Sequence, residues 1–141
     1  MRRPALFVYG TLRRGELAQH LLAGADYLGA VVISGRFDLR ALARYPMAWS
    51  PGRHAVAGEC YRVSPLTLRR VDRFEQIPWA YRRRLIRTPL GWAWIYLGHD
   101  GAGLPRRGRR LPQGLWRSSR RGHGGRLGCR TGFMAARRYR D

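Results

Sequence analysis

The chain of 141 residues contains no lysine, and all 28 of its basic residues are arginine. This absence, in a chain also rich in Gly, Ala, Pro and Trp, is typical of a GC-rich coding bias. The net charge of +20 would otherwise favour nucleic-acid binding. It is also unevenly placed, since residues 1–100 hold 16 Arg against seven acidic residues and residues 101–141 hold 12 Arg against one. The charge is therefore weak evidence about the function of the main body.

Cysteine and clustered histidine are scarce as well. Cys60 and Cys129 are the only two cysteines, which is too few for a disulfide framework or a metal set, although one disulfide stays open. The four histidines lie far apart and lack metal-ligand spacing. We therefore expect no metal site.

Long hydrophobic runs are absent too. No apolar stretch approaches the roughly 20 residues that a membrane-spanning helix needs. The opening "MRRPALFVYG" is basic, but its apolar part is too short for a secretory signal. We expect a cytoplasmic protein with no membrane partner.

The length and composition predict one domain over residues 1–117, followed by a tail at 118–141. The tail consists largely of Gly, Arg and Ser with few core-forming residues, so we expect disorder there.

Apolar patterning and Gly/Pro punctuation predict the elements of the main body. A helix is expected to begin at Ser64 as N-cap and Pro65 as first residue, and to stop before Pro78. Loops are expected at 43–54 and 99–110. We expect a further short helix at 16–24 and strands at 5–9, 30–39, 55–63, 81–88 and 91–98. This order favours an α+β fold built on a small curved sheet or barrel.

Glu75 is a candidate catalytic residue because of its place on the second helix. It lies four residues after Val71 and seven after Leu68, on the apolar face. Burial and the negative end of the helix dipole both raise the pKa of a carboxyl group so placed, which suits proton exchange near neutral pH. The alternative is a frayed helix end, with Glu75 turned outward to pair with Arg73 or Arg82.

The turn at Tyr9-Gly10-Thr11-Leu12 ends the first apolar run and is a candidate binding loop. Its successive N–H groups are able to form an anion-binding concavity. Alternatively, Gly10 serves only to permit a tight turn. The turn lacks the glycine and lysine pattern of nucleotide-binding loops, which argues against a nucleotide. The arginines that follow, Arg13 and Arg14, are interpreted as part of the coding bias.

Taken together, several motifs resemble the γ-glutamylcyclotransferase family, particularly its γ-glutamylamine cyclotransferase and AIG2-like branch. The resemblance covers about residues 4–117, and its most specific motif is "VDRFEQIPWAYRR", in which an Asp precedes Glu75 by three and Tyr81 follows it by six. The other motifs are "FVYGTLRRGE", "GRFDL" through "YP" at 35–46, "VAGECYRV", "WAWIYLG" and "LPQGLWR".

The resemblance implies a small mixed β-barrel flanked by short helices. It implies an acyltransferase or lyase that cyclises a small γ-glutamyl amine or amino acid to 5-oxoproline without a cofactor. The catalytic carboxylate maps onto Glu75, the substrate loop onto Tyr9, Gly10, Thr11 and Leu12, and a substrate-side role onto Tyr81.

Two departures from the family pattern bear on these expectations. Gln76 stands where the family usually has Gly, and the tail at 118–141 has no family counterpart. Two other functions stay open. One is a noncatalytic module of the same fold that binds a small carboxylate, and the other is nucleic-acid binding through the tail.

Overall fold

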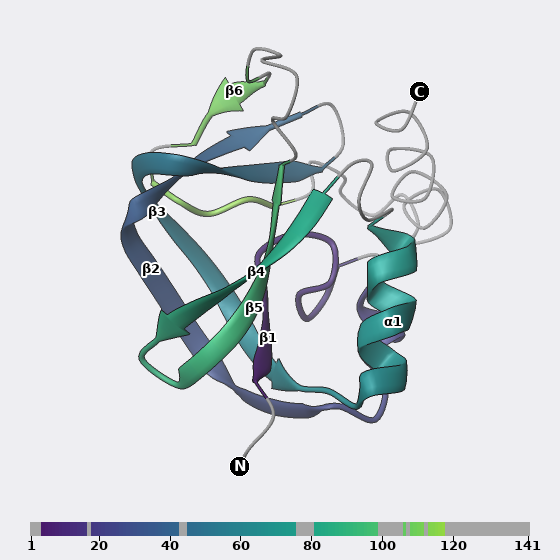
Figure 1. Ribbon diagram of the computed structural model, residues 1–141. Coiled ribbons are helices and arrows are strands. Elements are labelled where there is room, and N and C mark those ends of the chain that lie inside the picture. The colour runs from purple at the N-terminus through teal and green to yellow at the C-terminus, as the bar shows by residue number, and fades with distance from the viewer. Residues whose placement is uncertain are drawn as a thin grey trace.

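The computed structural model describes residues 4–16, 18–42, 45–75, 81–98, 106, 108–111 and 113–117. Its elements are shown in Figure 1. In chain order they are β1 (Ala5–Val8), the 3₁₀ helix η1 (Gln19–Leu22), β2 (Asp26–Ala41), β3 (Pro46–Arg62), α1 (Pro65–Phe74), β4 (Tyr81–Thr88), β5 (Gly91–Gly98) and β6 (Arg109–Arg110).

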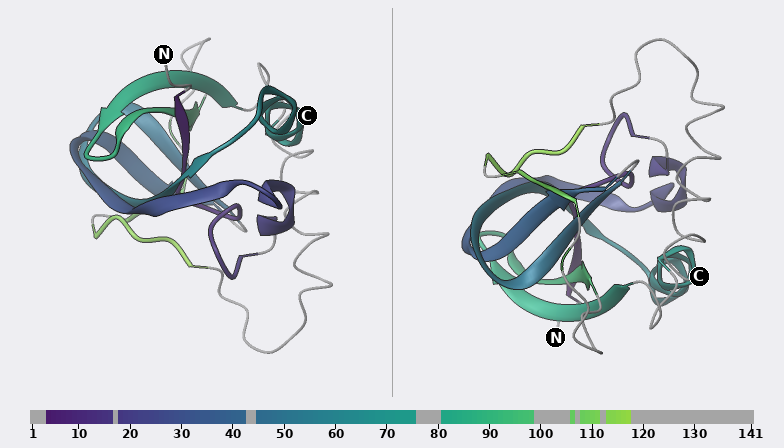
Figure 2. Two further views of the ribbon diagram at one scale, coloured as in Figure 1. Left: turned by 90° about the horizontal axis from the view of Figure 1, so that it is seen from below. Right: turned by 90° about the horizontal axis from the view of Figure 1, so that it is seen from above.

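The strands form a single mixed sheet in the order β4-β5-β1-β3-β2-β6. β1 pairs with β5 in parallel, and the other neighbours are antiparallel. Figure 2 shows that the sheet curls into a half-barrel, with α1 and η1 beside it. The predicted α+β class and mixed barrel are confirmed.

Two apolar clusters lie on opposite faces of the sheet, and β1 contributes to both. Ala5 and Phe7 belong to the cluster inside the curl, together with Ile95 and Leu97 of β5. Leu6 and Val8 belong to the cluster between the sheet and the helices, where Val71 of α1 packs. A strand covered on both faces must be apolar throughout, which accounts for the continuous apolar run at the start of the chain.

The loop expected at 43–54 is wrong over most of its length, because β3 begins at Pro46. β2 and β3 form one long hairpin that starts from the pair Ala41↔Pro46. Between the pairs Phe37↔His54 and Asp38↔Trp49 the register shifts, so residues 50–53 bulge from β3. Proline is tolerated at the first residue of a strand and in bulges, and both prolines of this segment occupy such positions.

The second predicted helix is confirmed in place and type. The Ser64 side chain accepts a hydrogen bond from the Thr67 N–H at 3.1 Å, and Pro65 is the first residue of α1. The helix expected at 16–24 is reduced to the four-residue η1, and the loop expected at 99–110 contains the short strand β6 at its end. Strands 81–88 and 91–98 are confirmed.

A closing segment at 111–117 returns the chain to the sheet. The Leu111 N–H donates to the Leu39 carbonyl at 2.8 Å, and the Ala57 N–H donates to the Gly114 carbonyl at 2.7 Å. Trp116 is buried. The tail at 118–141, with Cys129, lies outside the described residues.

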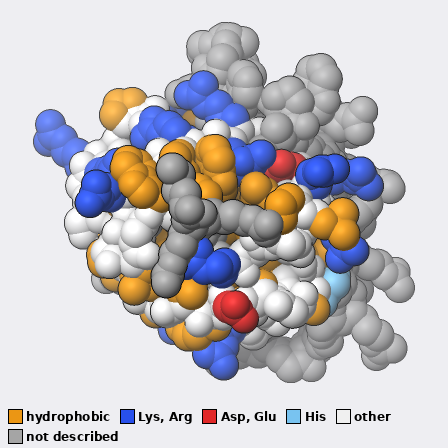
Figure 3. All heavy atoms as spheres, turned by 60° about the horizontal axis from the view of Figure 1, so that its bottom comes forward, with side chains coloured by type: hydrophobic (Ala, Val, Ile, Leu, Met, Phe, Trp, Pro, Cys, Tyr) orange, Lys and Arg blue, Asp and Glu red, His pale blue; other side chains and the backbone are white. Residues whose placement is uncertain are grey.

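The surface in Figure 3 shows arginine side chains spread among apolar and neutral groups, with few acidic ones. No helix in the described part of the chain has the length and apolar character needed to cross a membrane.

Candidate active site

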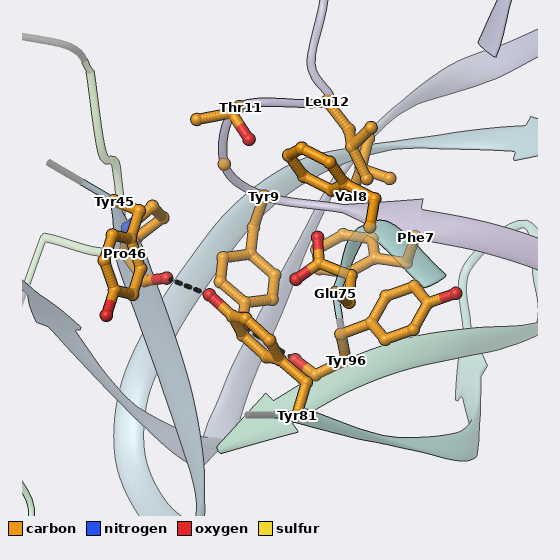
Figure 4. Close-up of a pocket in the computed structure, with 12 residues that line it drawn as sticks. Phe7, Val8, Tyr9, Thr11, Leu12, Tyr45, Pro46, Glu75, Tyr81 and Tyr96 are labelled. Carbon is orange, nitrogen blue, oxygen red and sulfur yellow. Dashed lines mark hydrogen bonds between the residues drawn. The ribbon is translucent and has the colours of Figure 1, made fainter. Parts of the chain in front are cut away.

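A pocket that is partly open to solvent lies where β1 ends beside the last turn of α1. Figure 4 shows the Glu75 side chain in the middle of this pocket, with the loop that carries Thr11 and Leu12 above it. All six predicted site residues line it. The full lining is Phe7, Val8, Tyr9, Gly10, Thr11, Leu12, Tyr45, Pro46, Phe74, Glu75, Tyr81 and Tyr96.

Glu75 follows directly after the last helical residue of α1. Its N–H donates to the Val71 carbonyl at 2.8 Å, which continues the helical pattern and keeps Glu75 on the same face as the buried Val71. The residue is only 9% exposed. The interpretation with Glu75 turned outward is therefore wrong.

The surroundings of Glu75 favour its protonated form. Burial, and then the nearby negative charge of Asp72, raise the pKa of Glu75 from 4.5 to about 8. Among the described residues, no hydrogen-bond donor reaches its carboxyl group. A carboxyl group with this pKa can both accept and return a proton near neutral pH.

The loop after β1 is held by its carbonyl groups. The Arg13 N–H donates to the Gly10 carbonyl at 3.1 Å, and the Ala18 N–H donates to the Thr11 carbonyl at 2.8 Å. Within the described part of the chain, the N–H groups of Gly10, Thr11 and Leu12 have no protein acceptor. Backbone N–H groups of this kind are suited to an anion.

Gly10 is required by close packing rather than by its backbone angles. A Cβ atom at Gly10 would lie 2.8 Å from Cγ of Pro46 and 3.0 Å from its Cδ. Loop and hairpin therefore approach each other at the pocket wall only because residue 10 has no side chain.

The hydroxyl groups of the two predicted tyrosines make structural hydrogen bonds, two of which are drawn in Figure 4. Tyr9 donates to the Tyr96 carbonyl at 2.7 Å and accepts from the Ala48 N–H at 3.0 Å. Tyr81 donates to the Pro46 carbonyl at 3.0 Å. These bonds fix β1, β3, β4 and β5 around the pocket.

Sequence reasoning assigned no site role to Tyr96, which lines the pocket from β5. The feature of the sequence that could have identified Tyr96 is its hydroxyl group, which lies within an otherwise apolar strand. The interpretation of Arg13 as coding bias is also wrong. Its side chain is buried, donates to the Trp116 carbonyl and lies 3.5 Å from the Glu16 carboxylate. Arg14 is exposed, and its side chain lies over the Tyr27 ring.

Within the described ranges, no three His, Cys, Asp or Glu side chains gather as a metal site requires. The pocket is instead lined by one carboxyl group and by the loop of Gly10, Thr11 and Leu12.

A curled mixed sheet whose pocket is lined by a buried carboxyl group and by a loop with unbonded backbone N–H groups is consistent with a small-molecule site suited to proton transfer. The sequence comparison agrees with this class. Residues 6–118 match the family model "Gamma-glutamyl cyclotransferase, AIG2-like", and the chain belongs to this family.

Individual relatives support the assignment. The chain is 41% identical over 92 residues to a protein of Vibrio cholerae named putative gamma-glutamylcyclotransferase, covering 65% of this chain and 79% of the relative. It is 33% identical over 110 residues to gamma-glutamylaminecyclotransferase of Rattus norvegicus, covering 71% and 69%. The crystal structure of an AIG2-like protein from Mus musculus matches with a TM-score of 0.65 and 27% identity. The match covers 88% of this chain and 100% of the mouse chain.

Proposed function

We propose that this protein cyclises a γ-glutamyl amine or γ-glutamyl amino acid to 5-oxoproline and releases the amine, with Glu75 as general acid and base. The observation that carries the proposal is the position of Glu75 in the pocket, 9% exposed and with its pKa raised to about 8. Family membership supports the same class of reaction.

The reaction breaks one C–N bond and forms another within the substrate. The α-amine attacks the γ-carbonyl carbon, and the bond from this carbon to the leaving nitrogen then breaks. The α-amine is an ammonium group at neutral pH and must first lose a proton, while the leaving nitrogen must gain one. One carboxyl group can accept the first proton and donate the second, which contributes roughly 10²–10⁴-fold to the rate.

Besides proton transfer, the reaction requires hydrogen-bond donors for the negative charge of the substrate. The loop of Gly10, Thr11 and Leu12 has such donors. Its N–H groups face the substrate's α-carboxylate or the oxyanion that develops on the γ-carbonyl oxygen. Because the attack is intramolecular, the remaining task is to hold the substrate folded back on itself. The enclosing side chains of Tyr45, Phe74 and Tyr81 would restrict the substrate to that conformation.

The cyclisation chemistry does not specify which amine is released as the leaving group. The relative from rat is named for γ-glutamylamines, and the described lining contains no basic side chain that would bind a second carboxylate. Both observations favour a γ-glutamyl amine over a γ-glutamyl amino acid.

The test is a 5-oxoproline assay across matched γ-glutamyl amines and γ-glutamyl amino acids. We expect turnover of at least one γ-glutamyl amine by the wild-type chain, and a rate about 10²–10⁴-fold lower by Glu75→Gln. A thermal shift on adding these compounds without any turnover would refute the enzymatic proposal and support a noncatalytic binding module. Equal turnover by wild type and Glu75→Gln would refute the role of Glu75.

A further inference from the structure

The side chains of Asp72, Arg83 and Tyr96 form a cluster, and Asp72 lies one helical turn before Glu75. Nε and Nη2 of Arg83 donate to Oδ1 and Oδ2 of Asp72 at 2.7 and 3.0 Å. The Tyr96 hydroxyl donates to Oδ1 of Asp72 at 2.6 Å. The Arg83 guanidinium lies over the Trp94 ring, 4.4 Å from its centroid. The cluster therefore joins α1 to both β4 and β5.

The geometry of this cluster favours a well-defined arrangement over a mobile surface pair. The side chains of Arg83 and Asp72 are 25% and 21% exposed. A two-point arginine–carboxylate contact is directional, and stacking on an aromatic ring restricts the guanidinium further. Arg83 and Tyr96 are also paired residues in the β4–β5 register, so the two donors come from adjacent strands.

This arrangement is bonded to the turn of α1 that precedes Glu75. Among the described residues, nothing donates a hydrogen bond to the Glu75 carboxyl group, so its place in the pocket depends on the backbone at the end of α1. Asp72 is the point where that last turn is bonded to the sheet. A displacement of the turn would move Glu75 directly.

The cluster also places a charge beside Glu75. The other titratable side chains that line the pocket are tyrosines: Tyr9 after β1, Tyr45 before β3, Tyr81 from β4 and Tyr96 from β5. Asp72 is the neighbouring carboxylate that acts on Glu75. Arg83 offsets this negative charge.

We propose that the Asp72–Arg83–Tyr96 cluster is a positioning device that aims Glu75 into the pocket and, through its balance of charge, tunes the proton exchange of Glu75. This inference rests on the proposed function, because it assigns the cluster a role in the same reaction. Asp72 and Arg83 act through Glu75 and do not line the pocket.

The charge part of the proposal can be measured without turnover. The chain contains only three glutamates, Glu16, Glu59 and Glu75, so ¹³Cδ-glutamate labelling gives three carboxyl NMR signals, and the Glu75→Gln spectrum assigns one of them. We expect Asp72→Asn to lower the titration midpoint of Glu75 by about one pH unit, because a nearby negative charge is removed. We expect Arg83→Gln to raise it by about one pH unit, because the charge of Asp72 is then uncompensated.

Arg70→Gln is the matched control, since Arg70 is exposed on the same helix and should leave the midpoint unchanged. A midpoint that stays at the wild-type value in both cluster variants, or moves in the same direction in both, would overturn the charge part. If Asp72→Asn fails to fold, Arg83→Gln alone decides, and an unchanged midpoint overturns the charge part.

The positioning part is tested by Arg83→Lys, which keeps the charge and loses the two-point contact. We expect a midpoint close to that of the wild type and a kcat for 5-oxoproline release about tenfold lower, because the aim of Glu75 is relaxed. A kcat equal to that of the wild type would overturn positioning. If the wild type releases no 5-oxoproline, the proposed function fails, whereas the NMR titration still decides the charge part.

Discussion

Asp72 and Glu75 are two carboxyl groups on one helix, three residues apart, with different surroundings. Asp72 accepts hydrogen bonds from Arg83 and Tyr96, whereas Glu75 faces the pocket with no donor among the described residues. The helix periodicity placed Glu75 correctly on the apolar face. It could not assign partners to Asp72, because Arg83 and Tyr96 become neighbours only through the β4–β5 register.

The raised pKa of Glu75 predicts a pH-dependent stability. Folding raises this pKa from 4.5 to about 8, so between these values the folded state holds a proton that the unfolded chain has released. The free energy of unfolding therefore falls as the pH rises through this range, by a few kcal/mol. We predict that Glu75→Gln removes this fall, as measured by urea unfolding at pH 4.5 to 8.5.

Asp26→Asn is the control for this prediction, since it also changes a carboxyl group to an amide but at an exposed position on β2. It should retain the fall. The same pH slope in wild type and Glu75→Gln would contradict the burial of an ionisable Glu75.

The Tyr9 hydroxyl gives a second prediction at this scale. Its removal in Tyr9→Phe leaves the Tyr96 carbonyl and the Ala48 N–H without their buried partner. We predict a loss of about 1–3 kcal/mol in the free energy of unfolding. Tyr27→Phe is the control, because Tyr27 is 44% exposed, and a similar loss in both variants would contradict the structural role of the Tyr9 hydroxyl.

At the scale of elements, the sequence predicted those helices and strands whose bounds depend on residues nearby in the chain. The N-cap at Ser64 and the proline at 65 marked the start of α1, and strands 81–88 and 91–98 follow from apolar patterning around a turn. The β2–β3 hairpin was missed because Pro46, Pro51 and Gly52 are ordinarily signs of a loop. Pairing with β2 overrides such signs when the prolines occupy a strand start and a bulge.

The loop between β1 and η1 gives a prediction at this scale. Gly10→Ala would place a Cβ atom 2.8 Å from Pro46, so the loop and the hairpin must separate. We predict a fall of tenfold or more in kcat/KM for 5-oxoproline release, because the N–H groups move relative to Glu75. An unchanged kcat/KM would mean that this loop does not position the substrate.

At the scale of the whole molecule, we propose that the closing segment at 111–117 is the end of the domain. Trp116 is buried, and Arg13 reaches its carbonyl from the loop beside the pocket. We predict that a chain shortened to residue 117 retains cooperative unfolding and 5-oxoproline release, whereas a chain shortened to residue 110 loses both. Equal behaviour of the two would contradict the domain boundary that we propose.

The net positive charge is also a property of the whole molecule. The arginine-rich tail at 118–141 lies outside the described residues, so nucleic-acid binding through it stays a prediction of the sequence. Salt-dependent DNA binding that is lost in the chain shortened to residue 117 would support it. Binding that survives the truncation would place it elsewhere on the molecule.

The central claim is that Glu75 transfers the protons in an intramolecular cyclisation. It is tested most directly by the rate of 5-oxoproline release from a γ-glutamyl amine, with Glu75→Gln compared to wild type and to the exposed control Asp26→Asn. The account predicts a rate lower by about 10²–10⁴-fold in Glu75→Gln, with its fold intact by circular dichroism, and a wild-type rate in Asp26→Asn. A folded Glu75→Gln variant that releases 5-oxoproline at the wild-type rate would contradict the account.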